Sequence, residues 1–462
     1  MEFLHGIQTT FEPRANASFT GPMTSVIALI GTAPKGAPDT LTLVNSRRDA
    51  QTKFGTELSG FTIPYALEAI YKQGGGATVL VVNTFDPDSH NLVADDDPVA
   101  IANGRGVTLF NPNTAVVLTS ADGNTTYVQG TDYTIDAFGE VRVIDGTVIA
   151  DGTTPLAGYS YFDPTTVTSA DSVASLEVLD LALPSFGYTP KIIIAPEHCE
   201  NEAVALKMFE KATSFGAVYF VDAPKDKTVT EVKQGRGPLG GIPGFRNANK
   251  NLQPMYPYAV TLDSKGETVS RPLSPFIAGV AARSDNEFGV QRSLSNQVLT
   301  GVIGADTVIS SSYTDPASDA NQLNKLGVMT LFNTQDRGMV SWGNRNASAP
   351  SNTEQDVFLS IERTKLMLIE AININNVRFL DRGTSSGLVN AIIESNNAYL
   401  RGLKSQGVIV DGKMTLDSEL TTTAEIAQGR LYFSVDFAGI SPAERLTFTL
   451  AFNPDYLESV IA

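Results

Sequence analysis

Cysteine and histidine are scarce in this sequence of 462 residues, which contains one cysteine and three histidines. A single thiol, Cys199, cannot form an intramolecular disulfide, and a zinc site built from cysteines is excluded as well. The shortage also leaves few candidates for nucleophilic or metal-dependent catalysis. Assembly in a reducing, cytosolic compartment is consistent with this composition.

Positive charge is also in short supply. The 33 Lys and Arg residues face 50 Asp and Glu residues, so the formal net charge is −17, and no run of five or more basic residues occurs. Direct nucleic-acid binding is therefore not expected. Charged residues make up only 18% of the chain, which is below the usual quarter and favours a subunit that packs against copies of itself.

Long apolar runs are missing. The longest, such as residues 26–30 and 79–82, have the length of a strand and are too short to cross a bilayer. The N-terminus, which begins Met1-Glu2-Phe3, shows no basic region followed by an apolar stretch, so no secretion signal is visible. We expect a soluble protein without membrane insertion.

Two glycine-rich stretches could suggest nucleotide binding. Residues 235–240 match the dinucleotide pattern GxGxxG, but the preceding strand is expected to end about a dozen residues earlier, at Asp222. Pro238 also removes an N–H group from the turn that would bind the phosphates. Residues 74–76 are three glycines that precede a strand and lack a following Lys-Ser/Thr, so they are interpreted as a helix C-cap.

Two further clusters have simple structural interpretations. His198-Cys199-Glu200 is expected to form a loop after a strand, where adjacent side chains do not converge. Asp95-Asp96-Asp97 lacks the ligand spacing of an EF-hand and is expected to be a solvated turn. The sequence thus predicts no catalytic residue, no cofactor and no metal site, and the protein is not expected to be an enzyme.

The pattern of apolar residues predicts an α/β and α+β multidomain protein. Buried strands alternate with helices in an α/β core, while short strands separated by Asp-Gly turns predict an inserted all-β module. The expected divisions are an N-terminal arm (1–20), the α/β core (21–86 and 165–352), the inserted all-β domain (87–164) and a C-terminal α+β domain (353–462).

The C-terminal domain shows clear periodicity. Residues 356–380 and 386–404 carry apolar side chains at helical spacing. Residues 431–437 and 446–452 alternate strictly between apolar and polar or small side chains, which predicts a hairpin around Ser441-Pro442.

Residues 271–304 contain a distinctive order of parts. Ser274 is expected to cap a helix that begins with Pro275 and continues with small apolar residues suited to close backbone packing. The helix ends at Arg283 and Asp285, and a Ser-Leu-Ser-Asn turn follows. This order resembles the core of contractile tail sheath proteins, many of which have Arg-Thr-Asp where this chain has Arg283-Ser284-Asp285. Residues 3–7, 26–34, 66–83 and 431–453 are also similar to the corresponding segments of that family.

The resemblance implies strand exchange between subunits. In sheaths, N-terminal and C-terminal arms each add a strand to the C-terminal sheet of a neighbour, and hydrogen bonds of the resulting ladder hold the subunits together. The residues of this chain that would take part are Phe3, Leu4, Ile7, Leu446, Phe448, Leu450 and Phe452. Termini that fold back on their own domain are the alternative.

The resemblance also implies a mechanism and partners. Copies would form a helix of six-fold rings around an inner tail tube protein, bounded by baseplate and tail terminator proteins, and contraction would drive the tube through a cell envelope without nucleotide. The protein would be part of the virion after assembly in the host cytoplasm. Mixed charges on residues 356–404 suggest that Arg401 and Lys404 face the tube through weak ion pairs.

Two other functions stay open at this point. One is an α/β enzyme, which would need a convergent pocket of perturbed acids or bases. The other is a surface-binding protein that uses the inserted β module for recognition and remains a monomer.

Overall fold

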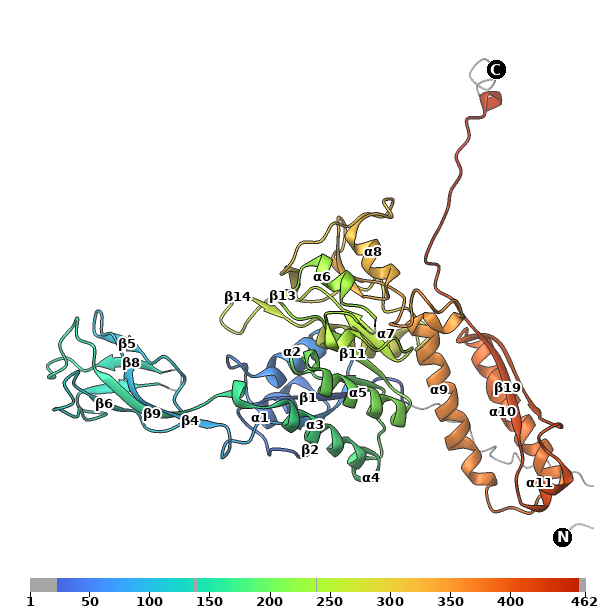
Figure 1. Cartoon of the computed structure of the whole chain (residues 1–462), viewed down its shortest axis with the longest axis horizontal. Helices are drawn as coiled ribbons and strands as arrows, with labels where there is room; N and C mark the ends of the chain where they lie inside the picture. Colours follow the sequence, from blue (N-terminus) through green and yellow to red (C-terminus); the bar gives the residue numbers. More distant parts are fainter. Residues whose placement is uncertain (1–22, 137–138, 238, 457–462) are drawn as a thin grey trace, which may run out of the picture. The chain divides into compact units, whose positions relative to one another are not determined.

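The computed structural model describes residues 23–136, 139–237 and 239–456 (Figure 1). The described chain forms two compact units. The larger, here called the core unit, contains residues 25–362 and 441–456, and the smaller, the C-terminal unit, contains residues 23–24 and 363–440. Helices and strands are mixed throughout, as the sequence predicts.

A six-stranded sheet forms the centre of the core unit. Its order is β12-β11-β10-β1-β3-β2, and all neighbours run parallel except the edge strand β2, which is antiparallel to β3. Most of these strands are buried along their length, which explains why they appear in the sequence as continuous apolar runs. The strands are β1 (Val26–Gly31), β2 (Leu41–Val44), β3 (Thr78–Asn83), β10 (Ile192–Ile194), β11 (Val218–Asp222) and β12 (Leu252–Met255).

Helices cover both faces of this sheet. Helices α3 and α5 pack on the face that presents Val26, Ala28 and Ile30 of β1, while α2 and α7 pack against each other and against β1 and β10. The strand–helix–strand order of the sequence thus produces the expected parallel α/β arrangement. The helices are α1 (Arg47–Phe54), α2 (Thr62–Lys72), α3 (Ser169–Glu177), α4 (Ala182–Phe186), α5 (Glu202–Phe215), α6 (Val229–Gln234) and α7 (Ser274–Glu287).

Small residues bring α7 unusually close to α2. A Cβ atom added to Gly279 of α7 would lie 2.5 Å from the carbonyl oxygen of Ile70, and one added to Gly75 would lie 2.3 Å from the backbone nitrogen of Arg283. The close packing that the small apolar residues predict is therefore present. Gly75 acts by allowing this approach, and the C-cap of α2 is Gln73 rather than a glycine.

The prediction that Ser274 is the N-cap of α7 is wrong. Ser274 is the first residue of the helix, and Leu273 occupies the cap position without a side-chain hydrogen bond. The carboxylate of Asp222, at the end of β11, instead accepts hydrogen bonds from the backbone nitrogen of Ser274 at 2.9 Å and from its hydroxyl at 2.5 Å. A group distant in sequence thus supplies the cap.

Two three-stranded sheets form a β module inserted after β3. Their orders are β4-β9-β6 and β5-β8-β7, and the module has its own core around Leu118, Tyr133 and Val141. The first and last strands, β4 and β9, pair with each other, with Asn91 opposite Phe162. The strands are β4 (Asn91–Pro98), β5 (Arg105–Val107), β6 (Val117–Thr119), β7 (Tyr133–Ile135), β8 (Glu140–Val143) and β9 (Leu156–Phe162).

The acidic run 95–97 is not a solvated turn. It lies in β4, and Asp97 is buried, where its carboxylate accepts hydrogen bonds from the hydroxyl of Tyr159 at 2.6 Å and from the backbone nitrogen of Leu109 at 2.7 Å. These donors come from residues far along the chain, and they make burial of a carboxylate acceptable.

Smaller elements complete the core unit. A three-stranded sheet has the order β14-β13-β15, and β16 pairs with β17. The elements are β13 (Ala259–Leu262), β14 (Thr268–Arg271), β15 (Val302–Ala305), α8 (Asp319–Lys325), β16 (Thr330–Thr334) and β17 (Gly338–Trp342).

The C-terminal unit contains two long helices and a two-stranded sheet. Helix α9 (Leu359–Asn376) enters it from the core unit, and α10 (Ser386–Ser405) packs against β18 (Ile409–Leu416). Strand β19 (Phe433–Gly439) pairs antiparallel with β18. The short helix α11 (Thr423–Ala427) lies between the two strands in the sequence.

The predicted hairpin of residues 431–452 is not formed. Its first half is β19, but the partner of β19 is β18, a strand that the sequence pattern does not predict. Residues 441–452 are extended and belong to no strand of the described chain (Figure 1). Strict alternation indicates a strand with one apolar face, but it does not specify which segment pairs with it.

Candidate functional site

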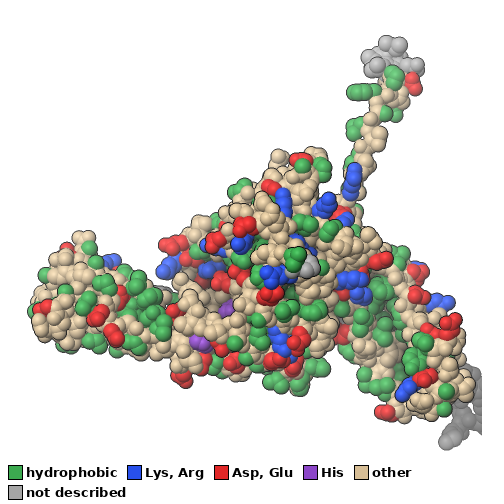
Figure 2. Space-filling model, viewed as in Figure 1, with side chains coloured by type: hydrophobic (Ala, Val, Ile, Leu, Met, Phe, Trp, Pro, Cys, Tyr) green, Lys and Arg blue, Asp and Glu red, His purple; other side chains and the backbone are tan. Residues whose placement is uncertain are grey.

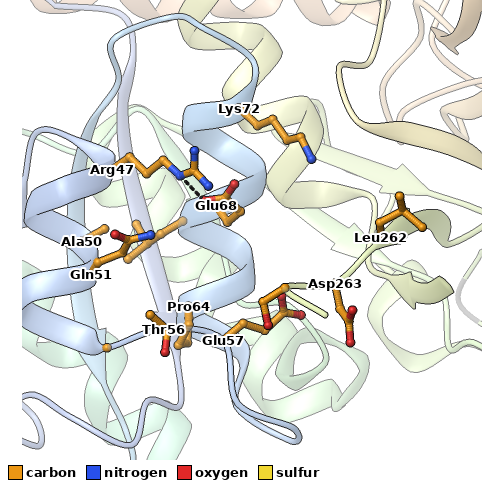
Figure 3. Close-up of a pocket in the computed structure, with 13 residues that line it drawn as sticks. Arg47, Ala50, Gln51, Thr56, Glu57, Pro64, Glu68, Lys72, Leu262 and Asp263 are labelled. Atoms are coloured by element: carbon orange, nitrogen blue, oxygen red, sulfur yellow. Dashed lines mark hydrogen bonds and ion pairs between the residues drawn. The ribbon is translucent and has the colours of Figure 1, made fainter. Parts of the chain in front are cut away.

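The described core unit has a small polar hollow beside α1 and α2 (Figure 3). It measures about 250 Å³, and Nε of Arg47 donates a hydrogen bond to Glu68 across it at 2.6 Å. Glu57, which also lines the hollow, forms an ion pair with Arg271. The described residues that line the hollow include neither histidine nor cysteine. Among these described residues, no hydrogen bond joins Thr56, Ser264 or Lys72 to a neighbouring carboxylate, as a nucleophile paired with a base would require.

A group of three acids lies at the carboxyl ends of β10 and β11, of which Asp222 is buried, Glu200 is half-buried and Glu197 is exposed. The hydroxyl of Tyr65 donates to Glu197 at 2.9 Å, and that of Tyr258 donates to Glu200 at 2.6 Å. Burial raises the pKa of Asp222 to about 7, even though two hydrogen bonds from Ser274 favour its charged form. Each carboxylate therefore has a local donor, and this group of acids holds α7 and the neighbouring loops in place.

His198 and Cys199 do not form a catalytic pair. His198 lies against the hydroxyl of Ser172 at 3.0 Å, and burial lowers the pKa of its imidazole to about 4. Cys199 is fully buried, its sulfur accepts a hydrogen bond from the backbone nitrogen of Asp222, and burial raises the pKa of its thiol. A thiol in this state is neutral and inaccessible.

The glycines at 235–240 pack against their own loop. They follow α6, and a Cβ atom on Gly240 would lie 2.0 Å from the carbonyl oxygen of Gly235. The guanidinium of Arg236 donates to the backbone carbonyls of Leu326, Phe245 and Ala347. Pro238 lies outside the described residues. The space that a phosphate would need is thus occupied by protein groups.

The strongest candidate for a functional surface is residues 446–452, here called the apolar tail. Leu446, Phe448, Leu450 and Phe452 are 71%, 79%, 92% and 105% exposed. No backbone hydrogen bond joins this segment to any other described residue. A row of alternate large apolar side chains left in solvent is unfavourable for an isolated protein and indicates a surface that a partner covers.

The start of the tail is attached to the core unit. Arg345 donates from Nε and Nη2 to the carboxylate of Glu444, with distances of 2.7–3.2 Å. This ion pair fixes the chain to the core unit at Glu444, two residues before the apolar tail begins. Of the residues predicted for strand exchange, the four in the tail are therefore exposed together on one segment, while Phe3, Leu4 and Ile7 lie outside the described residues.

The sheet of the C-terminal unit has an incompletely covered apolar face. Phe433, Val435 and Phe437 of β19 are only half-buried, whereas Met414 of β18 is buried. An open groove of about 600 Å³ runs along α10 and reaches Gly412 and Phe437. This face cannot be recognised from the sequence pattern, because the apolar alternation of β18 is interrupted by Asp411 and Gly412.

The two predicted tube-facing residues lie near the C-terminal end of α10. Arg401 is 3.7 Å from the carboxylate of Glu394, and Lys404 is 2.6 Å from that of Asp411. Both side chains are exposed. The structure therefore shows cations that already have acidic neighbours in their own unit, which weakens the attraction they would exert on a distant surface.

The β module carries about half of the net negative charge of the chain. Residues 87–164 contain eleven acidic and two basic residues, and Arg105 and Arg142 both pair with Glu140. In Figure 2 the module, at the left, shows acidic side chains among hydrophobic ones and little blue.

The described residues offer neither a cluster of metal ligands nor a membrane helix. They contain no group of three or more His, Cys, Asp or Glu side chains placed to hold a metal ion. Within the same residues, no helix is long and apolar enough to cross a bilayer.

Comparison with family models gives three consecutive matches. They are the N-terminal region of domain III of tail sheath protein Gp18 (residues 24–83), the central domain of phage tail sheath proteins (165–347) and the phage tail sheath C-terminal domain (358–453). The first two ranges leave residues 84–164 between them, which contain the β module.

Individual proteins are similar over nearly the whole chain. The tail sheath protein of Burkholderia phage BcepMu is 34% identical over 469 residues, which cover 98% of each chain. Among solved structures, the contracted helical sheath of the anti-feeding prophage aligns with a TM-score of 0.61 at 16% identity, over 98% of this chain and all of that one. The contracted sheath complex PVC of an extracellular contractile injection system aligns with a TM-score of 0.60 at 12% identity, over the same shares. At these low sequence identities, the two structural alignments show that the fold is shared and nothing more.

Proposed function

We propose a function from one premise: this chain belongs to the phage tail sheath protein family. It is a structural subunit of a contractile tail sheath and a component of the virion tail. We propose further that its copies polymerise as a helix of six-fold rings around an inner tail tube, and that contraction drives this tube through a cell envelope. Baseplate and tail terminator proteins are the proposed neighbours, and the host cytoplasm is the proposed place of assembly.

The observation that carries this proposal is the apolar tail. Its four large side chains are exposed and its backbone has no described partner, while its start is tied to the core unit through Glu444. A segment of this kind can gain burial and ladder hydrogen bonds by adding to a sheet of another copy. Head-to-tail contacts of this type propagate as a helix.

We also propose a separate role for each segment of the chain. Residues 1–20 act as a second linking arm, residues 21–86 and 165–352 as the sheath core, 87–164 as an inserted domain and 353–462 as the C-terminal domain. The inserted domains of neighbouring copies are all strongly negative and therefore repel one another. Contacts between copies are thus expected to involve the core and C-terminal domains. The proposed mechanism consumes no nucleotide, because the energy is stored in the extended assembly behind a kinetic barrier.

Electron microscopy of three purified proteins tests the proposal. These are the full chain, a variant lacking residues 1–20 and a variant ending at residue 445. Hollow tubes from the full chain and discrete particles from both variants are expected, with circular dichroism showing that each variant is folded. Tubes from the variant ending at residue 445 would rule out the role of the apolar tail. A full chain that stays monomeric even with a tube template would rule out the proposed polymerisation.

A further inference from the structure

Two short segments join the β module to the rest of the core unit. Residues 85–91 lead into β4, and residues 162–171 lead from the end of β9 into α3; together they are here called the neck (Figure 1). The two segments contact each other, since Asn91 pairs with Phe162 and the N–H of Asp163 donates to the C=O of His90 at 3.2 Å. The chain enters and leaves the module only here, so the neck controls how firmly the module is held.

Aromatic rings fill the interior of the neck. Phe85 is fully buried, and its ring centroid lies 5.0 Å from that of Phe61 and 5.3 Å from that of Phe162. The imidazole of His90 joins this cluster at 5.5 Å from Phe85, and its side chain is only 11% exposed. A charge formed in such a place would need polar partners close by.

The hydrogen bonds of His90 fit only the neutral ring. The backbone N–H of Asp86 donates to Nδ1 at 3.0 Å, so Nδ1 carries no proton in this arrangement. The N–H of His90 donates in turn to the C=O of Asp86 at 2.9 Å, which closes the turn 86–90. A proton on Nδ1 would place two donors against each other, so the ring would have to move away from Asp86 and the turn would open.

Two carboxylates of the neck interact with the ring. Oδ2 of Asp171, at the start of α3, lies 3.9 Å from Nε2 of His90, and the carboxylate of Asp86 lies in the same turn as the ring. The hydroxyl of Ser89 lowers the pKa of Asp86, and that of Thr168 lowers the pKa of Asp171. Both acids therefore stay ionised where histidine gains its charge, and they attract an imidazolium away from the N–H that it now binds.

The other acids of the neck do not contribute such an interaction. The carboxylate of Asp163 accepts from the N–H and the hydroxyl of Thr165 at 2.9 and 2.7 Å, and Asp88 lies at an exposed position. Neither segment of the neck contains a lysine or an arginine. A protonated His90 would thus be the one basic side chain among these acids.

We propose that His90 is a pH-dependent switch in the neck: the neutral ring holds the turn 86–90 closed and fixes the β module, and protonation opens the turn and lets the module move. This inference goes beyond the function proposed above, because it concerns the mobility of the module whatever the chain assembles with. Since the closed turn has no place for a proton on Nδ1, acid favours the open turn.

Time-resolved fluorescence anisotropy of the full chain tests the switch. A dye is attached to Val148→Cys, at a site in the β module that is 71% exposed, while the native Cys199 is fully buried and does not react. We expect the residual anisotropy at this site to be lost as the pH falls from about 8 to about 5. Leu206→Cys, an exposed site on α5, is the control label and should keep its residual anisotropy, because it shares only the overall tumbling.

Two variants assign the response to the ring. His90→Asn places an amide oxygen near the position of Nδ1 and cannot be protonated, so the module should stay fixed over the whole pH range. Asp171→Asn removes a carboxylate that attracts the imidazolium, so the transition should shift to lower pH. Asp88→Asn is the matched control in the turn and should leave the midpoint unchanged.

Constant anisotropy at residue 148 in the otherwise unchanged chain would overturn the proposal, and this result does not depend on whether a His90 variant folds. An equal loss at both labels would indicate unfolding or dissociation and would overturn it as well. A pH response that persists in His90→Asn, with circular dichroism showing a folded chain, would assign the motion to another group. His198 is not that group, because burial lowers its pKa to about 4, below the range of the experiment.

Discussion

Arg345 and Glu444 are 99 residues apart in the sequence and meet through two guanidinium nitrogens and both carboxylate oxygens. The carboxylate raises the pKa of the Arg345 guanidinium, mainly through these hydrogen bonds. Glu444 is only two residues before the apolar tail, so this ion pair determines where the tail leaves the core unit.

We expect Arg345→Ala to affect assembly more than stability. About a third of each side chain is exposed, and such pairs contribute roughly 0.2–1 kcal/mol to the free energy of unfolding. Urea denaturation should therefore show a small loss, while light scattering should show slower polymerisation because the tail starts from a less defined position. Arg105→Ala, which removes a surface pair in the β module, is the control. Equal polymerisation rates in the two variants would argue against a role for the attachment.

Phe448→Ser should weaken assembly without changing the stability of the monomer. The side chain is 79% exposed in the isolated chain, so its removal loses little burial there. In the assembly, burial of a phenylalanine is worth roughly 1.5–3 kcal/mol, which corresponds to a ten-fold or greater rise in the concentration needed for polymerisation. Sedimentation measures this concentration and thermal denaturation measures the stability. Thr449→Ser is the control, and a drop in melting temperature for Phe448→Ser would indicate that the tail packs on its own chain.

Asp222 should make stability dependent on pH. Its folded-state pKa, about 7, lies above the ordinary value of 3.8, so the folded protein binds this proton more tightly than the unfolded chain does. The contribution of Asp222 to the free energy of unfolding is therefore greatest below about pH 4, falls as the pH rises to about 7, and levels off above it. Asp222→Asn, which can still accept from Ser274, should thus gain stability relative to the wild type between pH 4 and pH 7.

Urea denaturation at several pH values measures this effect, which linkage limits to the order of 4 kcal/mol. Asp96→Asn, at an exposed position of β4, is the control and should follow the wild-type profile. Parallel profiles for Asp222→Asn and the wild type would contradict the assignment of the pH dependence to this carboxyl group.

Gly279→Ala and Gly402→Ala should have opposite effects. Both glycines lie in helices, where alanine is favoured by about 1 kcal/mol. A Cβ atom at Gly279 would lie 2.5 Å from the carbonyl oxygen of Ile70, so overpacking should lower the free energy of unfolding by roughly 1–3 kcal/mol. No heavy atom counted as a neighbour lies within 4 Å of a Cβ at Gly402, so this variant should be more stable. Chemical denaturation distinguishes the two, and a stabilising Gly279→Ala would show that the two helices can separate at little cost.

Reversing the charges of Arg401 and Lys404 tests whether α10 faces the inner tube. Replacement of both by Glu should weaken polymerisation around a tube template but leave the fold intact, because both side chains are exposed. Lys413→Glu, a single reversal on an exposed residue of β18, is the control. Tubes of normal length from the double variant, seen by electron microscopy, would remove these residues from the proposed tube contact.

The sequence predicts the local elements of this fold better than their partners. The strands at 26–31 and 78–83 and the helix at 386–405 are found as expected, because each depends on a short apolar pattern. The alternation at 446–452 is equally regular, yet it predicts a hairpin that does not exist. A pattern of this kind describes one face of a strand and carries no information on the chain that supplies the other side.

Buried polar groups show the same limit. Asp97 follows two other aspartates, and such an acidic run is usually solvated. Its burial is possible because Tyr159 and the backbone of Leu109 donate hydrogen bonds to its carboxylate. Ser274 looks like an N-cap because the sequence does not reveal that Asp222 lies beside it. Asn397 is an ordinary helix residue until β18 is placed against it, where its amide bonds to both backbone groups of Met414. Each of these side chains acquires its role from a residue brought close by tertiary structure.

The pairing of Asn91 with Phe162 places the two ends of the β module next to each other, so the module can be replaced as a unit. The chain leaves the core along β4 and returns along β9, so the two junctions are neighbours in one ladder and the parallel sheet is built entirely from residues on either side of them. A foreign domain whose termini lie equally close together can be spliced in at this point without moving the strands of the core. The β module can then be exchanged while the strands and helices of the parallel sheet keep their sequence.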